Sequence, residues 1–333
     1  SSSGPQTFYD SGSVLYFRAT DGTNGVELWK SDGTESGTVL VKDIYVGGMG
    51  SIPEYLISIG SILYFRCNDG LKGEELWRSD GTEIGTYRVK NINIDTYSSS
   101  PYYLTPMDST VFFSATNKTN GIELWKSDGT ELGTVMVKDI YAGTSSSQPN
   151  CLHVFENNLY FGADDGVHGS ELWRSDGTEE GTVMIKDMNV GAVGGIVSPT
   201  IFFTFGEVML FNGYDGVNGI ELWKSDGTEG GTTIVKDIYP GENSGLPLGE
   251  VFVKIDNTVY FGADDGSNGY ELWKSDGTEL GTVMFKDLIT GPSAGNPSDL
   301  TIVGSTLYFI AYDLSSNRVL WKSDGTEVGT VII

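Results

Sequence analysis

The side chains best suited to binding chemistry are two arginines at equivalent places in a repeated phrase. Arg18 ends a run LYFR, and Arg66 ends a second LYFR 48 residues later. In the five further copies of the phrase this position holds Ser114, Gly162, Asn212, Gly262 and Ile310. A guanidinium group binds a carboxylate or sulfate through two parallel hydrogen bonds. We therefore predict that Arg18 and Arg66 bind an anionic ligand, or alternatively that they form ion pairs with acids of neighbouring repeats.

Tyrosines in and beside the loops that connect the repeats form a second group of candidate ligand-binding residues. They are interleaved with Ser and Asn, so that they offer both stacking surfaces and hydrogen bonds to a glycan or a peptide. The ordinary polarity of surface loops is the alternative explanation of this composition. The candidates are Tyr97, Tyr102, Tyr103, Tyr141 and Tyr239.

Paired aspartates supply the candidate metal ligands. Asp164 with Asp165, and Asp264 with Asp265, begin equivalent DG turns, and oxygen-rich loops suit calcium, which takes six to eight oxygen ligands. The alternative is that these carboxylates only bind the backbone of their own hairpin turn. Calcium is thus the one cofactor that we consider, and otherwise we predict none.

Catalytic motifs are poorly represented. The two histidines, His153 and His168, have no evident partners for a triad, and clusters of His and Cys are absent from the sequence. The sequence has 45 Asp and Glu residues, so pairs of acids occur by chance, and a pair that cleaves a glycoside is therefore not excluded. We predict that the protein is not an enzyme.

All seven tryptophans lie in one phrase that recurs every 48 or 50 residues, as in ELWKSDGTESGTVLVKDI. A large ring at one place in every repeat predicts packing between repeats, and an SDGT sequence predicts a tight turn. The tryptophans are Trp29, Trp77, Trp125, Trp173, Trp223, Trp273 and Trp321.

Each repeat contains four short runs of β-branched and aromatic residues, separated by Gly, Asp, Asn and Ser. A four-stranded meander with a period of about 48 residues is typical of a propeller blade. We therefore predict an all-β protein, a single seven-bladed β-propeller over residues 1–333 with four antiparallel strands per blade. The predicted blades are residues 6–44, 54–92, 102–140, 150–188, 200–238, 250–288 and 298–333.

The seven copies of this phrase resemble the ELWxxDGT repeat proteins of bacterial and marine organisms, and the resemblance covers essentially the whole chain. It implies a secreted or cell-surface protein and no particular reaction. In an extracellular setting the sequon Asn117-Lys118-Thr119 would make Asn117 a candidate glycosylation site.

The net charge of the chain restricts the classes of molecule that it can bind. The sequence has 45 Asp and Glu against 20 Lys and Arg, a net charge of −25, which excludes binding to nucleic acid. No apolar run approaches the roughly 18 residues that membrane insertion needs.

We predict a non-enzymatic extracellular binding or adhesion module that recognises a glycan or a protein on a surface through the face formed by the interblade loops. The alternatives are a structural building block that contacts neighbouring domains or subunits of a cell-surface or filamentous assembly, and a propeller-type glycoside hydrolase.

Overall fold

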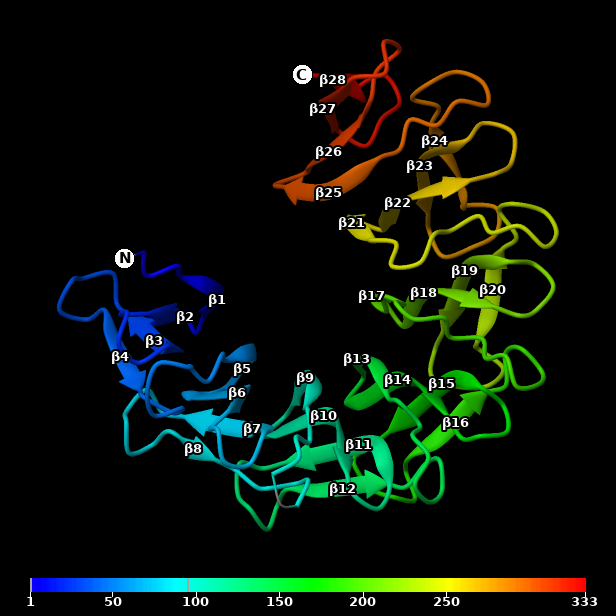
Figure 1. Ribbon diagram of the computed structural model, residues 1–333. Coiled ribbons are helices and arrows are strands. Elements are labelled where there is room, and N and C mark those ends of the chain that lie inside the picture. The colour runs from blue at the N-terminus through cyan, green and yellow to red at the C-terminus, as the bar shows by residue number, and fades with distance from the viewer. Residues whose placement is uncertain (1, 95) are drawn as a thin grey trace. The chain divides into compact units, whose positions relative to one another are not determined.

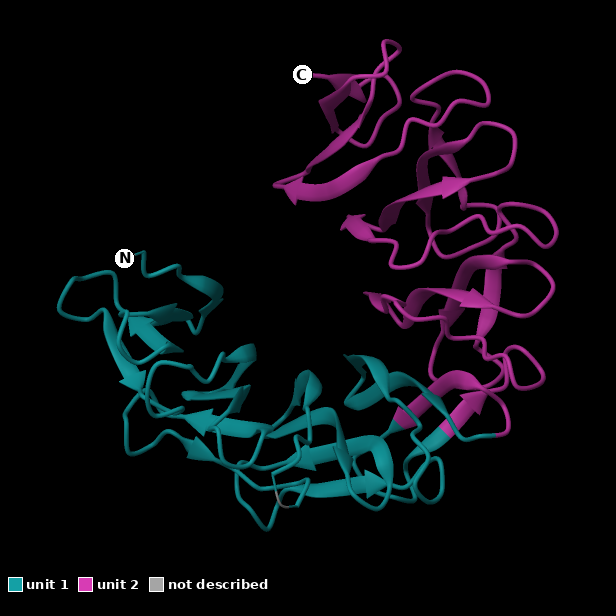
Figure 2. Ribbon diagram, in the orientation of Figure 1, with its two compact units in different colours: residues 1–166, 175–183 teal, residues 167–174, 184–333 magenta. Residues whose placement is uncertain are grey.

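The computed structural model describes residues 2–94 and 96–333. The chain divides into two compact units, shown in Figure 2: unit 1 is Ser1–Gly166 with Ser175–Val183, and unit 2 is Val167–Arg174 with Met184–Ile333. The organisation of residues 1–333 as a single domain stays a prediction. In the described part of the chain, no helix is long and apolar enough to span a membrane.

The described residues form 28 strands in seven four-stranded antiparallel sheets (Figure 1). In every sheet the strands are adjacent in chain order, so that each sheet is a simple meander. This confirms the predicted fold class, an all-β, seven-bladed β-propeller with four antiparallel strands per blade.

The blades are numbered in chain order. Blade 1 contains β1 (Gln6–Asp10), β2 (Leu15–Thr20), β3 (Val26–Ser31) and β4 (Val39–Lys42). Blade 2 contains β5 (Glu54–Ile59), β6 (Ile62–Asn68), β7 (Glu74–Ser79) and β8 (Tyr87–Arg88). Blade 3 contains β9 (Tyr102–Met107), β10 (Thr110–Asn117), β11 (Gly121–Ser127) and β12 (Val135–Lys138). Blade 4 contains β13 (Asn150–Phe155), β14 (Asn158–Asp164), β15 (Ser170–Ser175) and β16 (Val183–Lys186).

The remaining three blades follow the same order. Blade 5 contains β17 (Phe203–Phe205), β18 (Val208–Tyr214), β19 (Ile220–Ser225) and β20 (Thr233–Lys236). Blade 6 contains β21 (Val253–Ile255), β22 (Thr258–Asp264), β23 (Tyr270–Ser275) and β24 (Val283–Lys286). Blade 7 contains β25 (Ser298–Val303), β26 (Thr306–Tyr312), β27 (Arg318–Ser323) and β28 (Val331–Ile332).

The hydrophobic core lies in the seams, meaning the packed interfaces between consecutive blades. Alternate residues of a strand point to opposite faces, so Leu28 and Trp29 belong to opposite faces of blade 1. Leu28 is fully buried, and it packs with Tyr16 against Phe65 and Trp77 of blade 2. The same arrangement recurs in unit 2, where Leu222 and Trp273 share a cluster. Four of the tryptophans, Trp77, Trp125, Trp273 and Trp321, thus pack with buried residues of the preceding blade.

Trp29 is the exception. The other six indoles are 5–7% exposed, whereas Trp29 is only half-buried. The tryptophan is covered by residues of the preceding blade in blades 2, 3, 6 and 7. Packing of Trp29 between blades stays a prediction.

Polar bonds fix each seam at its outer edge. The lysine of the VKD phrase donates to a backbone carbonyl of the next blade, as Lys42 does to Thr86 O at 2.7 Å and Lys236 to Thr282 O at 2.8 Å. The SDGT turn is held internally, because Asp128 accepts hydrogen bonds from the N–H of Thr130 at 2.8 Å and from its hydroxyl at 2.7 Å. The carboxylate is thus used by the turn itself, as the repeat predicts.

A buried glutamate fixes each interblade loop. Glu123 is fully buried and accepts the N–H of Ile140 at 3.0 Å, the N–H of Ser147 at 3.0 Å and the Ser147 hydroxyl at 2.5 Å. Burial raises its pKa to about 7 although these bonds act in the opposite direction. Equivalent carboxyls with a pKa of about 7 are Glu75, Glu171, Glu221 and Glu271.

Truncation of a buried seam tryptophan will destabilise the fold. We expect Trp125→Ala to lower the free energy of unfolding by about 3–5 kcal/mol, because it removes a buried aromatic ring and leaves a cavity. Trp29→Ala is the matched control, and its half-buried ring predicts a smaller loss. Urea denaturation followed by circular dichroism measures both. Equal losses in the two variants would show that the indoles are equally buried in solution.

The buried glutamates predict a pH dependence of stability. Their pKa of about 7 in the folded chain is above the value of about 4.3 in an unfolded chain. Their contribution to stability is therefore complete below about pH 4.3 and is lost as pH rises through about 7. The turn aspartates, such as Asp128, have a lowered pKa and stay ionised throughout this range. We expect the melting temperature to fall between about pH 5 and pH 8, and a rise over that interval would contradict this assignment.

Candidate functional site

The blades differ most at the start of the first strand and at the paired position on the second strand. Residue pairs across these strands are Gln6 with Arg18 in blade 1 and Glu54 with Arg66 in blade 2. In blade 3 the pair is Tyr102 with Ser114, and in blade 4 it is Asn150 with Gly162. Neither position belongs to the repeated core. The residue type at both positions can therefore vary from blade to blade.

Arg18, Glu54 and Arg66 form one ion-pair network in unit 1. Arg18 Nη1 donates to Glu54 Oε1 at 2.9 Å across the seam between blades 1 and 2. Arg66 Nη2 donates to the other carboxylate oxygen, Oε2. Burial acts to raise the pKa of Glu54, but the two guanidinium groups outweigh it and hold the pKa below its usual range. The predicted ion pair between blades is thus present, and it joins the two predicted arginines through a single glutamate.

Two tyrosine rings flank the Arg66 guanidinium. Its central carbon lies 4.8 Å from the ring centroid of Tyr55 and 4.3 Å from that of Tyr102. The two rings are in edge contact with each other, with centroids 5.2 Å apart, and both are exposed to solvent. We call Arg18, Glu54, Tyr55, Arg66 and Tyr102 the arginine–tyrosine cluster.

One guanidinium nitrogen in this cluster, Nη1 of Arg66, has no hydrogen bond to the described residues. Arg66 is only 7% exposed, and its Nη1 is buried without a hydrogen-bond partner among the described residues. Nη1 forms an ion pair with Glu74 Oε2 at 3.5 Å. A buried donor of a charged group costs free energy unless it is bonded, so Nη1 has unused capacity for an acceptor.

A residue with positive φ lies at or beside each tyrosine of the cluster, at Tyr55 itself and at Tyr103 next to Tyr102. Tyr55 has φ of +55° at an irregularity in the pairing of β5 with β6, and Tyr103 has φ of +55° at the equivalent place in β9. A residue with a side chain pays of order 1–3 kcal/mol for such a conformation, which often marks a functional site. Thr7, Cys151 and Asp299 repeat the conformation in blades 1, 4 and 7.

The other predicted tyrosines do not join the cluster. Tyr141 and Tyr239 lie over the DG turns of the following blades, where a Cβ at Gly166 or Gly266 would overlap their rings. Tyr45 has the same place over Gly70. These rings therefore pack on backbone, which accounts for their recurrence. Tyr97 and Tyr103 are exposed side chains.

The four candidate calcium ligands lie in their predicted turns. Asp164 and Asp264 accept the N–H groups of Gly166 and Gly266, each at 2.7 Å. Asp265 accepts the N–H groups of Ser267 and Asn268, each at 2.9 Å. Across residues 2–94 and 96–333, no group of three or more His, Cys, Asp or Glu side chains could hold a metal ion. Calcium binding at Asp164, Asp165, Asp264 and Asp265 stays a prediction.

Asn117 ends β10 and begins a turn. Its side-chain oxygen accepts the N–H of Thr119 at 3.0 Å and the N–H of Asn120 at 2.7 Å. Its glycosylation stays a prediction.

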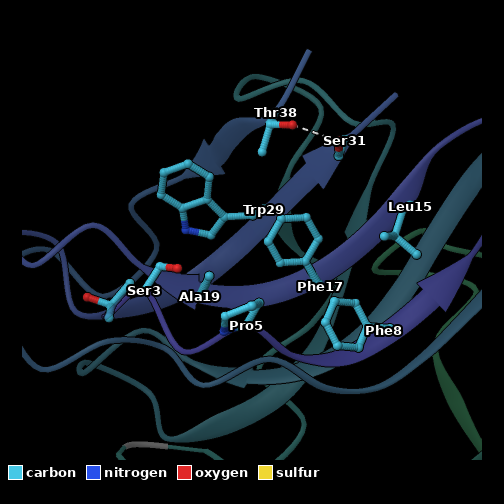
Figure 3. A pocket seen from close by; sticks show the side chains of 10 residues that line it. Ser3, Pro5, Phe8, Leu15, Phe17, Ala19, Trp29, Ser31 and Thr38 are labelled. Carbon is cyan, nitrogen blue, oxygen red and sulfur yellow. Dashed lines mark hydrogen bonds between the residues drawn. The ribbon is translucent and has the colours of Figure 1, made fainter. Parts of the chain in front are cut away.

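An apolar cavity of about 370 Å³ opens on blade 1 beside Trp29. Figure 3 shows the indole, Phe17 and Phe8 along one side of the sheet, with Pro5 and Ala19 nearby. Phe8 and Phe17 are in ring contact, with centroids 5.9 Å apart. The lining is mostly apolar and carries few groups that could orient a polar ligand.

Sequence reasoning missed Glu54 and Tyr55. Alignment of the repeats by their 48-residue period would have found Glu54, because the same column holds Gln6, Tyr102 and Asn150. It would not have found the ring contacts of Tyr55, since these depend on the backbone conformation at the irregularity in β5.

No family model and no curated protein matches the chain. Solved structures do match it along its whole length. They include a Mycobacterium tuberculosis puromycin-hydrolyzing peptidase (12% identity, TM-score 0.45, covering 99% of this chain and 53% of that one). A prolyl endopeptidase matches with 11% identity and a TM-score of 0.49, covering 100% of this chain and 50% of that one. A puromycin hydrolase matches with 14% identity and a TM-score of 0.49, covering 99% and 54%. The chain therefore spans about half the length of the solved chains it matches.

These matches correct the predicted function. The sequence predicted a non-enzymatic extracellular adhesion module, with a structural building block or a glycoside hydrolase as alternatives, whereas the matched structures are peptidases and puromycin hydrolases. The predicted function was wrong because it was inferred largely from the repeated residues. These residues build the blades, and proteins of many functions share the same blade architecture. At identities of 11–14% the likeness extends to the fold alone.

Proposed function

We propose that this chain is the peptide-binding propeller domain of a peptidase-type protein, and that the arginine–tyrosine cluster binds the free carboxylate end of a short peptide. The observation that carries the proposal is the buried Arg66 guanidinium, which has an unbonded Nη1 and lies between two exposed tyrosine rings. In this proposal the domain supplies recognition and no catalytic group.

The chemistry of the cluster fits both parts of such a ligand. A carboxylate is the planar acceptor that a guanidinium group binds most strongly. Arg18 and Arg66 share the carboxylate of Glu54, and Glu74 lies 3.5 Å from Arg66 Nη1 without a hydrogen bond, so this nitrogen can still donate to the carboxylate of a ligand. The faces of Tyr55 and Tyr102 offer apolar contact to the adjoining side chain of the peptide.

The net charge of the chain restricts the peptide further. A charge of −25 repels polyanions and attracts cations over distances of about a Debye length. The proposed ligand is therefore a peptide with a free carboxylate and otherwise neutral or basic side chains. Secretion or a cell-surface location stays a prediction.

Titration calorimetry with matched peptides tests the proposal. We expect a short peptide with a free C-terminal carboxylate to bind at least about tenfold more tightly than its amide, which corresponds to about 1.4 kcal/mol. Arg66→Gln is expected to reduce binding of the acid to the level of the amide, because it removes the charged donor. Equal affinity for acid and amide in the wild-type protein would contradict the proposal.

Arg88→Gln is the matched control. The Arg88 guanidinium lies in the same blade as Arg66 but pairs with Asp69 at 2.5 Å, outside the cluster. We expect this variant to bind the peptide acid as the wild-type protein does. Circular dichroism confirms that each variant is folded, and an equal loss of binding in both arginine variants would argue against the cluster as the site.

A further inference from the structure

A seam in unit 2 has the same design as the arginine–tyrosine cluster but lacks its cations. Asn212 on β18 pairs with Leu222, as Arg18 on β2 pairs with Leu28. Glu250 precedes Gly262 by twelve residues, as Glu54 precedes Arg66. The seam between blades 5 and 6 therefore keeps the glutamate, and it has an amide and a glycine where the seam between blades 1 and 2 has two guanidinium groups.

Glu250 is bonded only by neutral donors. It is 8% exposed, and its Oε1 accepts the N–H of Gly262 at 2.6 Å. Its Oε2 accepts the hydroxyl of Tyr270, which occupies the space that a side chain at position 262 would need. Within the described residues Glu250 forms no ion pair, whereas Glu54 forms two. Burial raises the pKa of Glu250 to about 7, so its side chain is ionised at pH 8, and a buried carboxylate without a counter-charge is then unfavourable.

Asn212 adds a second group without a partner. Its side chain is fully buried, and neither Oδ1 nor Nδ2 has a hydrogen-bond partner among the described residues. A native structure rarely leaves such an amide unbonded, and an unseen water or ion is one of the few explanations.

Contacts across the seam join the segments that carry the two groups. The Thr200 hydroxyl donates to the backbone carbonyl of Asn212 at 3.5 Å, and Pro199 lies against Gly249, next to Glu250. The rings of Phe203 and Phe252 are in contact, with centroids 6.1 Å apart. The segments that lead into β17 and β21 are therefore packed together, in the way that brings Arg18 to Glu54 in unit 1.

We propose that a monovalent metal cation binds between Asn212 and Glu250, in the place that the Arg18 guanidinium has beside Glu54. The amide oxygen of Asn212, the carboxylate of Glu250 and the phenol oxygen of Tyr270 are its protein ligands. One positive charge balances the single carboxylate. Calcium would need six to eight oxygens and usually several carboxylates, which this site does not offer.

The first experiment measures the melting temperature of the whole chain at pH 8 in potassium, sodium and choline chloride at equal ionic strength. Choline is a quaternary ammonium ion, which oxygen ligands do not coordinate as they do a metal ion, so its chloride controls for screening. We expect a rise of about 2 °C or more in potassium or sodium relative to choline, because binding to the folded state stabilises it. Equal melting temperatures in the three salts would overturn the proposal. A melting temperature that rises in calcium chloride of the same ionic strength, and in neither potassium nor sodium chloride, would also overturn it.

Two variants assign the effect to the site. Glu250→Gln is expected to abolish the difference between the salts. Glu54→Gln, the matched control, removes a glutamate whose cations belong to the protein, so it is expected to lower the melting temperature and keep the difference. Persistence of the difference in Glu250→Gln would overturn the proposal.

X-ray diffraction from crystals of the wild-type protein tests the proposed cation site even if Glu250→Gln does not fold. Crystals grown in rubidium chloride are expected to show an anomalous peak in contact with Asn212 Oδ1 and Glu250. A density there without anomalous signal would be water, and the proposal would then be wrong.

Discussion

The burial of each sheet against its neighbours is the constraint on which the structure depends. A four-stranded meander of this size has apolar residues on both faces, and neither face can be buried within one blade. Leu28 and Trp77 meet across one seam, and Leu222 and Trp273 meet across another, because the repeat places them at the same register in every blade. Trp29, at the same place in blade 1, is half-buried and lines an apolar cavity.

Polar groups complete the seams in a way that the sequence partly reveals. The repeated lysine, aspartate and glutamate residues are recognisable from their recurrence, and recurrence correctly indicates an architectural role. What it does not reveal is their burial. Glu123 and its equivalents appear in the sequence as part of an acidic surface, yet they are fully buried and bind the backbone of the interblade loop. The pattern of acids alone could not predict this, since burial of a charged group depends on where the loop after β12 returns to the sheet.

Positions that do not recur are harder to interpret from sequence. The two arginines were recognisable as departures from the repeat, and their pairing with acids of a neighbouring blade was one of two interpretations. The partner Glu54 and the flanking ring of Tyr55 were not predicted, because a β-strand irregularity with positive φ sets their orientation. Conversely, Tyr141 was singled out for its composition and position in a loop, but its ring packs on Gly166. Loop aromatics have structural roles wherever a glycine offers backbone to pack against.

Electrostatic balance explains why the variable positions differ as they do. Glu54 is balanced by two guanidinium groups, and in blade 7 Arg318 from the third strand bonds Ser298 at 2.6 Å and approaches Asp299 at 3.8 Å. In each of these blades the start of the first strand is matched by a group of complementary charge or bonding capacity from another strand. Glu250 is bonded only by the neutral donors of Gly262 and Tyr270, and Asn212 has no side-chain hydrogen bond among the described residues. Because the seams are fixed by residues elsewhere in the repeat, substitution at these positions leaves the architecture intact. The balance of charge at each seam is therefore set locally, by the residues at these variable positions.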